Sequence, residues 1–170
     1  REVVLAERRS CDYEGSTYRT DFWEGQGRDY EDRAERIAIR AMLPPRGRRL
    51  VDVGAGFGRL VELYAGYDEV VLLDYSQSQL EYARQRFGDE RYIYVAADIY
   101  HLPLADQAVD AVVMVRVLHH LEDVPVAFGH LARILAAGGA FVLEFANKRH
   151  LKSVLRWLLR RGGNPFTPEP

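Results

Sequence analysis

The chain has 170 residues, the length of a single domain, and its composition of 48% hydrophobic and 28% charged residues excludes disordered and fibrous proteins. Its net charge of −2 gives no indication of a polyanionic partner. Cys11 is the only cysteine, which excludes an intrachain disulfide framework and favours a cytoplasmic protein, and no apolar run reaches the roughly 18 residues of a membrane span.

Residues 1–28 are polar and aromatic with no clear period, and we predict that they form an N-terminal arm or lid. Residues 29–170 are expected to form the domain itself. This region begins with apolar residues at helical spacing from Asp29, and Pro44 and Pro45 end that helix.

Short apolar runs then alternate with segments of helical period. The expected strands are 50–53, 70–73, 92–97, 111–115 and 141–145, and the expected helices are 58–65, 80–87, 124–135 and 151–158. Gly138 and Gly139 are expected to cap the helix before the last strand. Strands that alternate with helices imply βαβ units, so we predict an α/β fold in three layers, with a doubly wound, mostly parallel sheet.

Three glycines follow the first strand with the spacing G-x-G-x-G, at Gly54, Gly56 and Gly58. Glycines between a strand and a helix allow a sharp turn and let a ligand approach the backbone. Asp74 ends the second strand, twenty residues beyond Gly54, where it can accept hydrogen bonds from both ribose hydroxyls of a nucleoside. The alternative is a glycine-rich turn with a capping aspartate.

The loop departs from the dinucleotide pattern G-x-G-x-x-G, because Arg59 occupies the position of the third glycine. Asp52, two positions before Gly54, would repel a pyrophosphate but suits a ligand that carries an ammonium group. The phosphate-loop signature G-x-x-x-x-G-K-[ST] is absent from the sequence.

Five segments, in the correct order, resemble the motifs of the class I S-adenosylmethionine-dependent methyltransferases, in the small-molecule branch of that family. They are 51–59 with the glycine loop, 74–76 (DYS), 97–99 (ADI), 110–121 (DAVVMVRVLHHL) and 135–139 (LAAGG), where Ala137 replaces the usual proline. The resemblance covers roughly residues 30–147 and implies a Rossmann-like methyltransferase fold with S-adenosylmethionine as cofactor.

The resemblance also implies a place for each part of the cofactor. The methionine end would lie over the glycine loop with its amino group near Asp52, and Asp74 would bind the ribose. Adenine would lie against Tyr75, Asp98 and Ile99. The expected cofactor-binding residues are Asp52, Gly54, Ala55, Gly56, Gly58, Asp74, Tyr75, Ser76, Asp98, Ile99, Arg116 and Tyr18.

Two of these expectations leave alternatives open. Arg116 ends an apolar strand, so it is expected either to contact a carboxylate of the cofactor or substrate, or to pair with Asp98 or Asp123. A sulfonium cation is favourable beside aromatic faces, so Tyr18 of the arm is expected to cover the cofactor. The alternative is that the aromatic residues of the arm only pack it onto the domain.

The resemblance implies a methyltransferase, and we expect its acceptor to be a small molecule or a lipid. His119 or His120 is the candidate general base, against the alternative that both only begin a loop and helix. No cluster of residues has the ligand spacing of a zinc site. The nucleobase branch of the family carries an Asn/Asp-Pro-Pro-aromatic loop where this chain has 115–118 (VRVL), which argues against nucleic acid as the acceptor.

Two other functions remain as alternatives. A cofactor-binding but non-catalytic partner subunit is compatible with the sequence, because methyl transfer requires no single catalytic signature. A nicotinamide-dependent oxidoreductase is disfavoured by the glycine spacing and by Asp52.

The family fold that the chain resembles has seven strands in the order 3-2-1-4-5-7-6, and five are expected here. We therefore expect the native polypeptide to continue beyond Pro170 and the fifth strand to form an exposed edge. Self-association through this strand or through the basic terminal helix is expected to follow. The basic residues near the terminus are Lys148, Arg149, Lys152, Arg156, Arg160 and Arg161.

Overall fold

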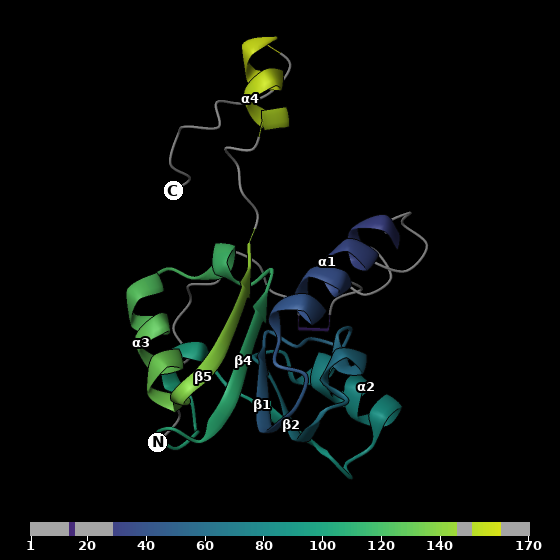
Figure 1. Ribbon diagram of the computed structural model, residues 1–170, viewed down its shortest axis with the longest axis vertical. Coiled ribbons are helices and arrows are strands. Elements are labelled where there is room, and N and C mark those ends of the chain that lie inside the picture. The colour runs from purple at the N-terminus through teal and green to yellow at the C-terminus, as the bar shows by residue number, and fades with distance from the viewer. Residues whose placement is uncertain (1–13, 16–28, 146–150, 161–170) are drawn as a thin grey trace.

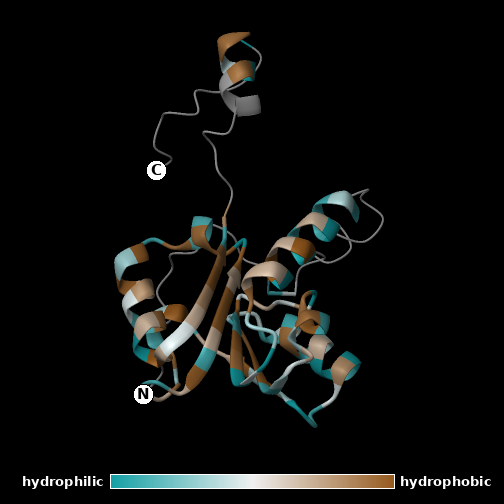
Figure 2. Cartoon of the chain, in the orientation of Figure 1, coloured by the Kyte–Doolittle hydropathy of each residue, from teal (hydrophilic) through white to brown (hydrophobic). Residues whose placement is uncertain are grey.

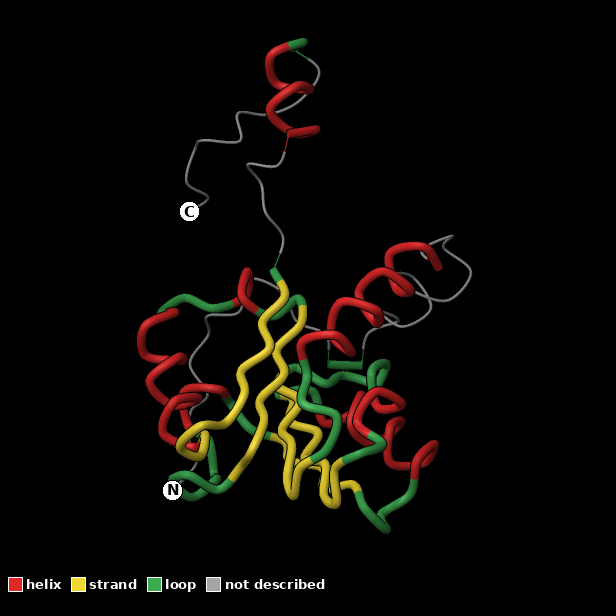
Figure 3. The backbone as a smooth tube through the Cα atoms, viewed as in Figure 1, coloured by secondary structure: helices red, strands yellow, loops and turns green. Residues whose placement is uncertain are grey.

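The computed structural model describes residues 14–15, 29–145 and 151–160 (Figure 1). Helices, strands and short 3-10 helices alternate along the chain (Figure 3). In order they are α1 (Asp29–Met42), β1 (Gly47–Val53), η2 (Val61–Tyr64), β2 (Tyr67–Asp74), α2 (Gln77–Phe87), β3 (Tyr92–Ala96), η3 (Ile99–His101), β4 (Val109–Val115), η4 (Leu118–His120), α3 (Val124–Ile134), β5 (Leu135–Glu144) and α4 (Leu151–Leu158).

The strands form one parallel sheet in the order β3-β2-β1-β4-β5. Val51 of β1 lies opposite Val71 of β2 on one side and opposite Val112 of β4 on the other. Because consecutive strands are parallel, the chain must cross over the sheet between them, and the crossovers carry the helices. The predicted α/β fold is confirmed, and the strand order equals that of the first five strands expected.

Alternate residues of the central strands face two different cores, which makes the molecule three layers thick. On one face Leu50 packs in a buried cluster with Ile39 of α1 and Leu80 of α2. On the other face Val51 packs in a cluster with Leu131 of α3. Figure 2 shows hydrophobic residues along the strands between these helical layers. This burial on both faces is typical of parallel sheets.

Two local expectations are wrong. Segment 58–65 is a turn followed by the 3-10 helix η2, because β2 already begins at Tyr67 and leaves no room for a longer helix. Gly138 and Gly139 do not cap α3, which ends at Ile134. They lie inside β5, in an irregular stretch of the β4–β5 register between Leu135 and Ala140.

The last element described is α4, where Leu155, Leu158 and Leu159 are exposed in and just after the helix. Among the helices within the described ranges, none is long and apolar enough to cross a membrane.

Candidate functional site

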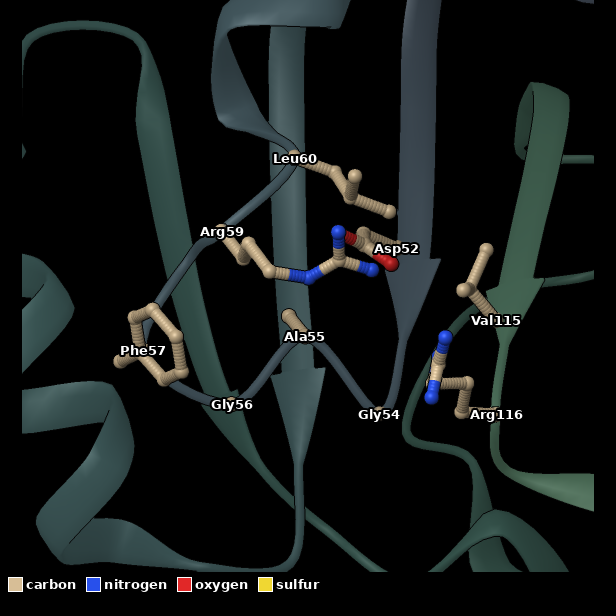
Figure 4. A pocket seen from close by; sticks show the side chains of 9 residues that line it. All are labelled: Asp52, Gly54, Ala55, Gly56, Phe57, Arg59, Leu60, Val115 and Arg116. Atoms are coloured by element: carbon tan, nitrogen blue, oxygen red, sulfur yellow. The ribbon is translucent and has the colours of Figure 1, made fainter. Parts of the chain in front are cut away.

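A hollow opens at the carboxyl ends of β1 and β4, where the chain leaves the two neighbouring strands toward opposite faces of the sheet (Figure 4). Open α/β sheets bind ligands at such a point. The residues that line the hollow are Asp52, Gly54, Ala55, Gly56, Phe57, Arg59, Leu60, Val115 and Arg116. Most of them belong to the predicted glycine loop.

The glycines of this loop have different functions. Gly54 has a φ of +75°, and a Cβ there would collide with Cγ2 of Val117 after β4. Gly56 has a φ of +52°, but a Cβ there would meet no atom within 4 Å. Gly58 does not line the hollow, because it packs against the ring of Phe87. Gly54 therefore permits close packing, whereas Gly56 leaves an open surface for a ligand.

Asp74, at the end of β2, joins the glycine loop to the start of α2. Its Oδ2 accepts a hydrogen bond from the Gly56 amide at 2.8 Å, and its Oδ1 accepts one from the Ser76 amide at 2.8 Å. Burial raises the pKa of this carboxyl, and the amide donors from Ser76, Gly56 and Tyr75 oppose that rise. Each carboxylate oxygen has a second lone pair, so the group can still accept hydrogen bonds from a ligand.

Asp52, inside β1, is 3% exposed and lies on the wall of the hollow. Its Oδ2 accepts a hydrogen bond from the hydroxyl of Tyr64 at 2.8 Å. Burial raises the pKa of Asp52 to about 7. The carboxyl group can therefore gain or lose a proton near neutral pH when a charged ligand approaches.

Arg116 points into the hollow from the end of β4, and its backbone has a φ of 60°. It is held by Glu35 of α1, whose Oε1 accepts from the Arg116 Nε at 2.8 Å. The Oε2 of Glu35 accepts from Arg59 of the glycine loop at 2.7 Å, so one carboxylate joins both sides of the hollow to α1. The residues considered as partners from the sequence have other functions: Asp98 caps η3 and Asp123 caps α3.

Sequence reasoning missed Glu35 and Tyr64. Glu35 is 81 residues from Arg116, and the only signal for it was a helix with neighbouring acidic residues at Glu31 and Asp32. Tyr64 falls in a segment predicted to be an ordinary helix, and the sequence held no signal for its contact with Asp52, because the burial that demands a polar partner exists only in the fold.

The residues expected around adenine lie along the same edge of the sheet. The amide of Ala97, which follows β3, donates to the carbonyl of Asp74 at 3.0 Å. Asp98 comes next, accepts from the Tyr100 amide at 3.0 Å, and keeps its side chain 37% exposed. Ile99 is 9% exposed, and Tyr75 is half-buried. Ser76 is fully buried and caps α2 through a hydrogen bond from Gln79.

The two histidines expected as bases lie in η4, beyond Arg116. Their ring centroids are 3.9 Å apart, with His119 exposed and His120 half-buried. Burial lowers the pKa of His120, and the neighbouring His119 lowers it further. Neither residue lines the hollow, so their catalytic role stays a prediction.

Tyr18 lies outside the described residues, but a part of the arm can be placed. The Gly15 amide donates to Oγ of Ser78 at 2.9 Å, and the Ser78 amide donates to Glu14 at 3.1 Å. Ser78 is in the first turn of α2, four residues after Asp74. This short segment of the arm therefore lies close to the predicted ribose site.

Comparison with known proteins decides the family. The methyltransferase domain family matches residues 51–143, which is more than half of the chain. The chain belongs to the class I S-adenosylmethionine-dependent methyltransferases.

The relatives of this chain are methyltransferases named for different acceptors. The demethylmenaquinone methyltransferase of Roseiflexus sp. (strain RS-1) is 34% identical over 128 residues, covering 73% of this chain and 53% of the relative. The malonyl-[acyl-carrier protein] O-methyltransferase of Pectobacterium atrosepticum is 36% identical over 111 residues, covering 64% of this chain and 42% of the relative. An S-adenosylmethionine-dependent methyltransferase from Mesorhizobium loti has a sequence 37% identical to this chain. Its crystal structure matches the fold with a TM-score of 0.57, covering 64% of this chain and 51% of that one. The chain thus spans about half the length of the curated relatives it matches.

The cofactor of the family is S-adenosylmethionine, and the residues of the hollow fit it. Open space lies above Gly56, where any side chain would intrude. Asp52 would supply a carboxylate for the ammonium group, and Asp74, which is hydrogen-bonded to the loop but does not line the hollow, would supply acceptors for hydroxyl groups. When bound, S-adenosylmethionine supplies an electrophilic methyl group on a sulfonium sulfur.

Alanine at two of the glycines should separate folding from cofactor binding. Gly54→Ala should lower the free energy of unfolding by roughly 2–4 kcal/mol, since a positive φ and a collision with Val117 both oppose it. Gly56→Ala should lower it by only about 1–2 kcal/mol, the cost of the backbone conformation, yet weaken cofactor binding. Urea unfolding and titration calorimetry measure the two effects, and an equal loss of stability in both variants would contradict this distinction.

Proposed function

We propose that this chain transfers a methyl group from S-adenosylmethionine to a small-molecule or lipid acceptor. The observation that carries the proposal is the Asp74 carboxylate, which is hydrogen-bonded to the open Gly56 loop and lies on the same edge as the buried Asp52. Methyl transfer needs little covalent assistance from a protein. Most of the acceleration would come from holding the reacting atoms about 3–3.5 Å apart and in line.

Each part of the cofactor has a proposed partner. Asp52 accepts from the ammonium group, the glycine loop lies under the methionine chain, and Asp74 accepts from the ribose hydroxyls. Adenine lies against Tyr75 and the segment at Asp98 and Ile99. The full proposed set is Asp52, Gly54, Ala55, Gly56, Asp74, Tyr75, Asp98, Ile99 and Arg116, with Gly58 and Ser76 shaping the loop and the start of α2.

The acceptor class rests on the names of the relatives, which are methyltransferases of demethylmenaquinone and of malonyl-[acyl-carrier protein]. If the acceptor is a hydroxyl or another acid, a base is needed. His120, half-buried beyond Arg116, is the better candidate of the histidine pair, because burial lowers its pKa and favours the neutral, proton-accepting imidazole at neutral pH. Nucleic acid is not a proposed acceptor.

A radiolabel assay tests the function. The full-length native protein would be incubated with methyl-labelled S-adenosylmethionine and a panel of demethylated quinones, acyl thioesters, other lipids and RNA. We expect transfer to a small molecule or lipid and none to RNA. Cofactor binding without transfer to any acceptor would favour a non-catalytic partner subunit, and tighter binding of NADH than of S-adenosylmethionine would overturn the assignment.

Three further proposals follow from the same site and sheet. Residues 1–28 form an arm over the cofactor, with Tyr18 against the sulfonium. The contact of Glu14 with Ser78 supports this proposal, and hydrogen exchange with and without cofactor tests it.

Self-association uses β5 or α4. This proposal is supported by Phe141 and Phe145, which are 37% and 52% exposed at the edge of the described sheet. A cytoplasmic location is proposed from the cysteine content alone.

A further inference from the structure

The Tyr64 side chain is in an unusual position for a polar group. It lies in η2, the short 3-10 helix after the glycine loop, and is 0% exposed. Its ring packs in the apolar cluster between the sheet and the helices α1 and α2. A buried tyrosine hydroxyl requires a hydrogen-bond partner, and here the partner is Oδ2 of Asp52 at 2.8 Å.

Two charged groups, Arg59 and Asp74, act on Asp52 from neighbouring segments. Arg59 of the glycine loop favours the carboxylate form, and Asp74 at the end of β2 disfavours it. Arg59 is itself neutralised in part by Glu35 of α1. The hydrogen bond from Tyr64 stabilises the carboxylate, because a donor to an ionised oxygen favours the charged form.

Without such a donor the carboxylate would be hard to keep ionised at this depth, since β1 lies at the centre of the sheet. A protonated Asp52 has no negative charge to offer an ammonium group. Tyr64 is fully buried and does not line the hollow, so its hydroxyl is expected to act on a ligand through Asp52.

We propose that Tyr64 is a positioning residue for the cofactor: its hydroxyl orients Asp52 and holds it in the charged form that accepts the ammonium group. This inference rests on the proposed function, in which Asp52 binds that group. When the cofactor binds to molecules with protonated Asp52, the carboxyl group releases its proton to solvent and the carboxylate takes an N–H donor. Proton release on binding is therefore a direct signature of the mechanism.

Titration calorimetry with S-adenosylhomocysteine between pH 6 and 8.5 tests the inference. In the unchanged protein at pH 7, binding should release about half a proton, since the pKa of Asp52 is about 7. Tyr64→Phe should move the pH midpoint upward by about one unit and thereby weaken binding at pH 7 by about fivefold, with affinity recovering at higher pH. The amino group of the ligand titrates equally in all variants, so a difference in the pH midpoint of binding between variants reports on the ionisation of Asp52.

Two further variants complete the experiment. Tyr67→Phe is the matched control, because Tyr67 is also buried but its hydroxyl donates to the Pro44 carbonyl at 3.0 Å, and it should leave the midpoint unchanged. Asp52→Asn should bind weakly at every pH and lose the proton release. An identical midpoint in Tyr64→Phe and the unchanged protein, with both folded, would overturn the inference while leaving the proposed function intact. Absence of any binding by the unchanged protein would overturn the proposed function and this inference together.

Discussion

Replacing Asp74 with alanine should weaken the binding of S-adenosylmethionine by about 2–3 kcal/mol, or roughly 30- to 150-fold. The variant would lack the hydrogen bonds that we propose between the Asp74 carboxylate and the ribose. It would also leave the Gly56 and Ser76 amides, which the carboxylate holds at 2.8 Å, without this acceptor, so the glycine loop proposed to lie under the methionine end would lose its anchor. Titration calorimetry on purified, folded variants measures the change.

Asp110 provides a matched control. Its Oδ2 also accepts hydrogen bonds from two backbone amides, those of Arg48 at 2.6 Å and Arg49 at 2.9 Å, but at the opposite, amino ends of β1 and β4. Asp110→Ala should therefore lower stability and leave the cofactor affinity unchanged. Unchanged affinity in Asp74→Ala would place the ribose elsewhere in the molecule.

Asp52→Asn should make the protein more stable at pH 8 while weakening its cofactor binding. Burial raises the pKa of Asp52 from 3.8 to about 7, so between these values the folded chain binds a proton that the unfolded chain has lost. The stability that this proton provides is fully present below about pH 4 and is lost as the pH rises through about 7. This rise in the pKa of Asp52 corresponds to about 4 kcal/mol of folding stability lost above pH 7, a loss that asparagine does not incur.

Urea unfolding from pH 4 to 8 measures this effect. The difference in free energy of unfolding between Asp52→Asn and the unchanged protein should grow with pH and become constant above about pH 8. Parallel curves over the whole range would show that Asp52 has a pKa close to that of the unfolded chain. The opposite changes in stability and affinity are expected because a charge kept for a ligand is costly to bury before the ligand arrives.

The sequence alone determined the features that depend on neighbours along the chain. Apolar runs located the five strands of the described sheet, and this prediction succeeded because a strand pattern is encoded within a few residues. The glycine spacing located the loop that lines the hollow, whereas the cofactor-binding function of that loop and of Asp74 stays a prediction. The parallel order of the sheet then followed from the resemblance to a family with that topology.

The tertiary structure alone decided how the site is held. Glu35 joins Arg59 and Arg116, which are 24 and 81 residues away, and no local pattern encodes a pair at that separation. The fold also shortened the expected helix at 58–65 to η2, whose last residue, Tyr64, donates its hydroxyl hydrogen bond to Asp52. Burial and long-range contacts set the charge of a carboxyl group, and both exist only after the strands have assembled.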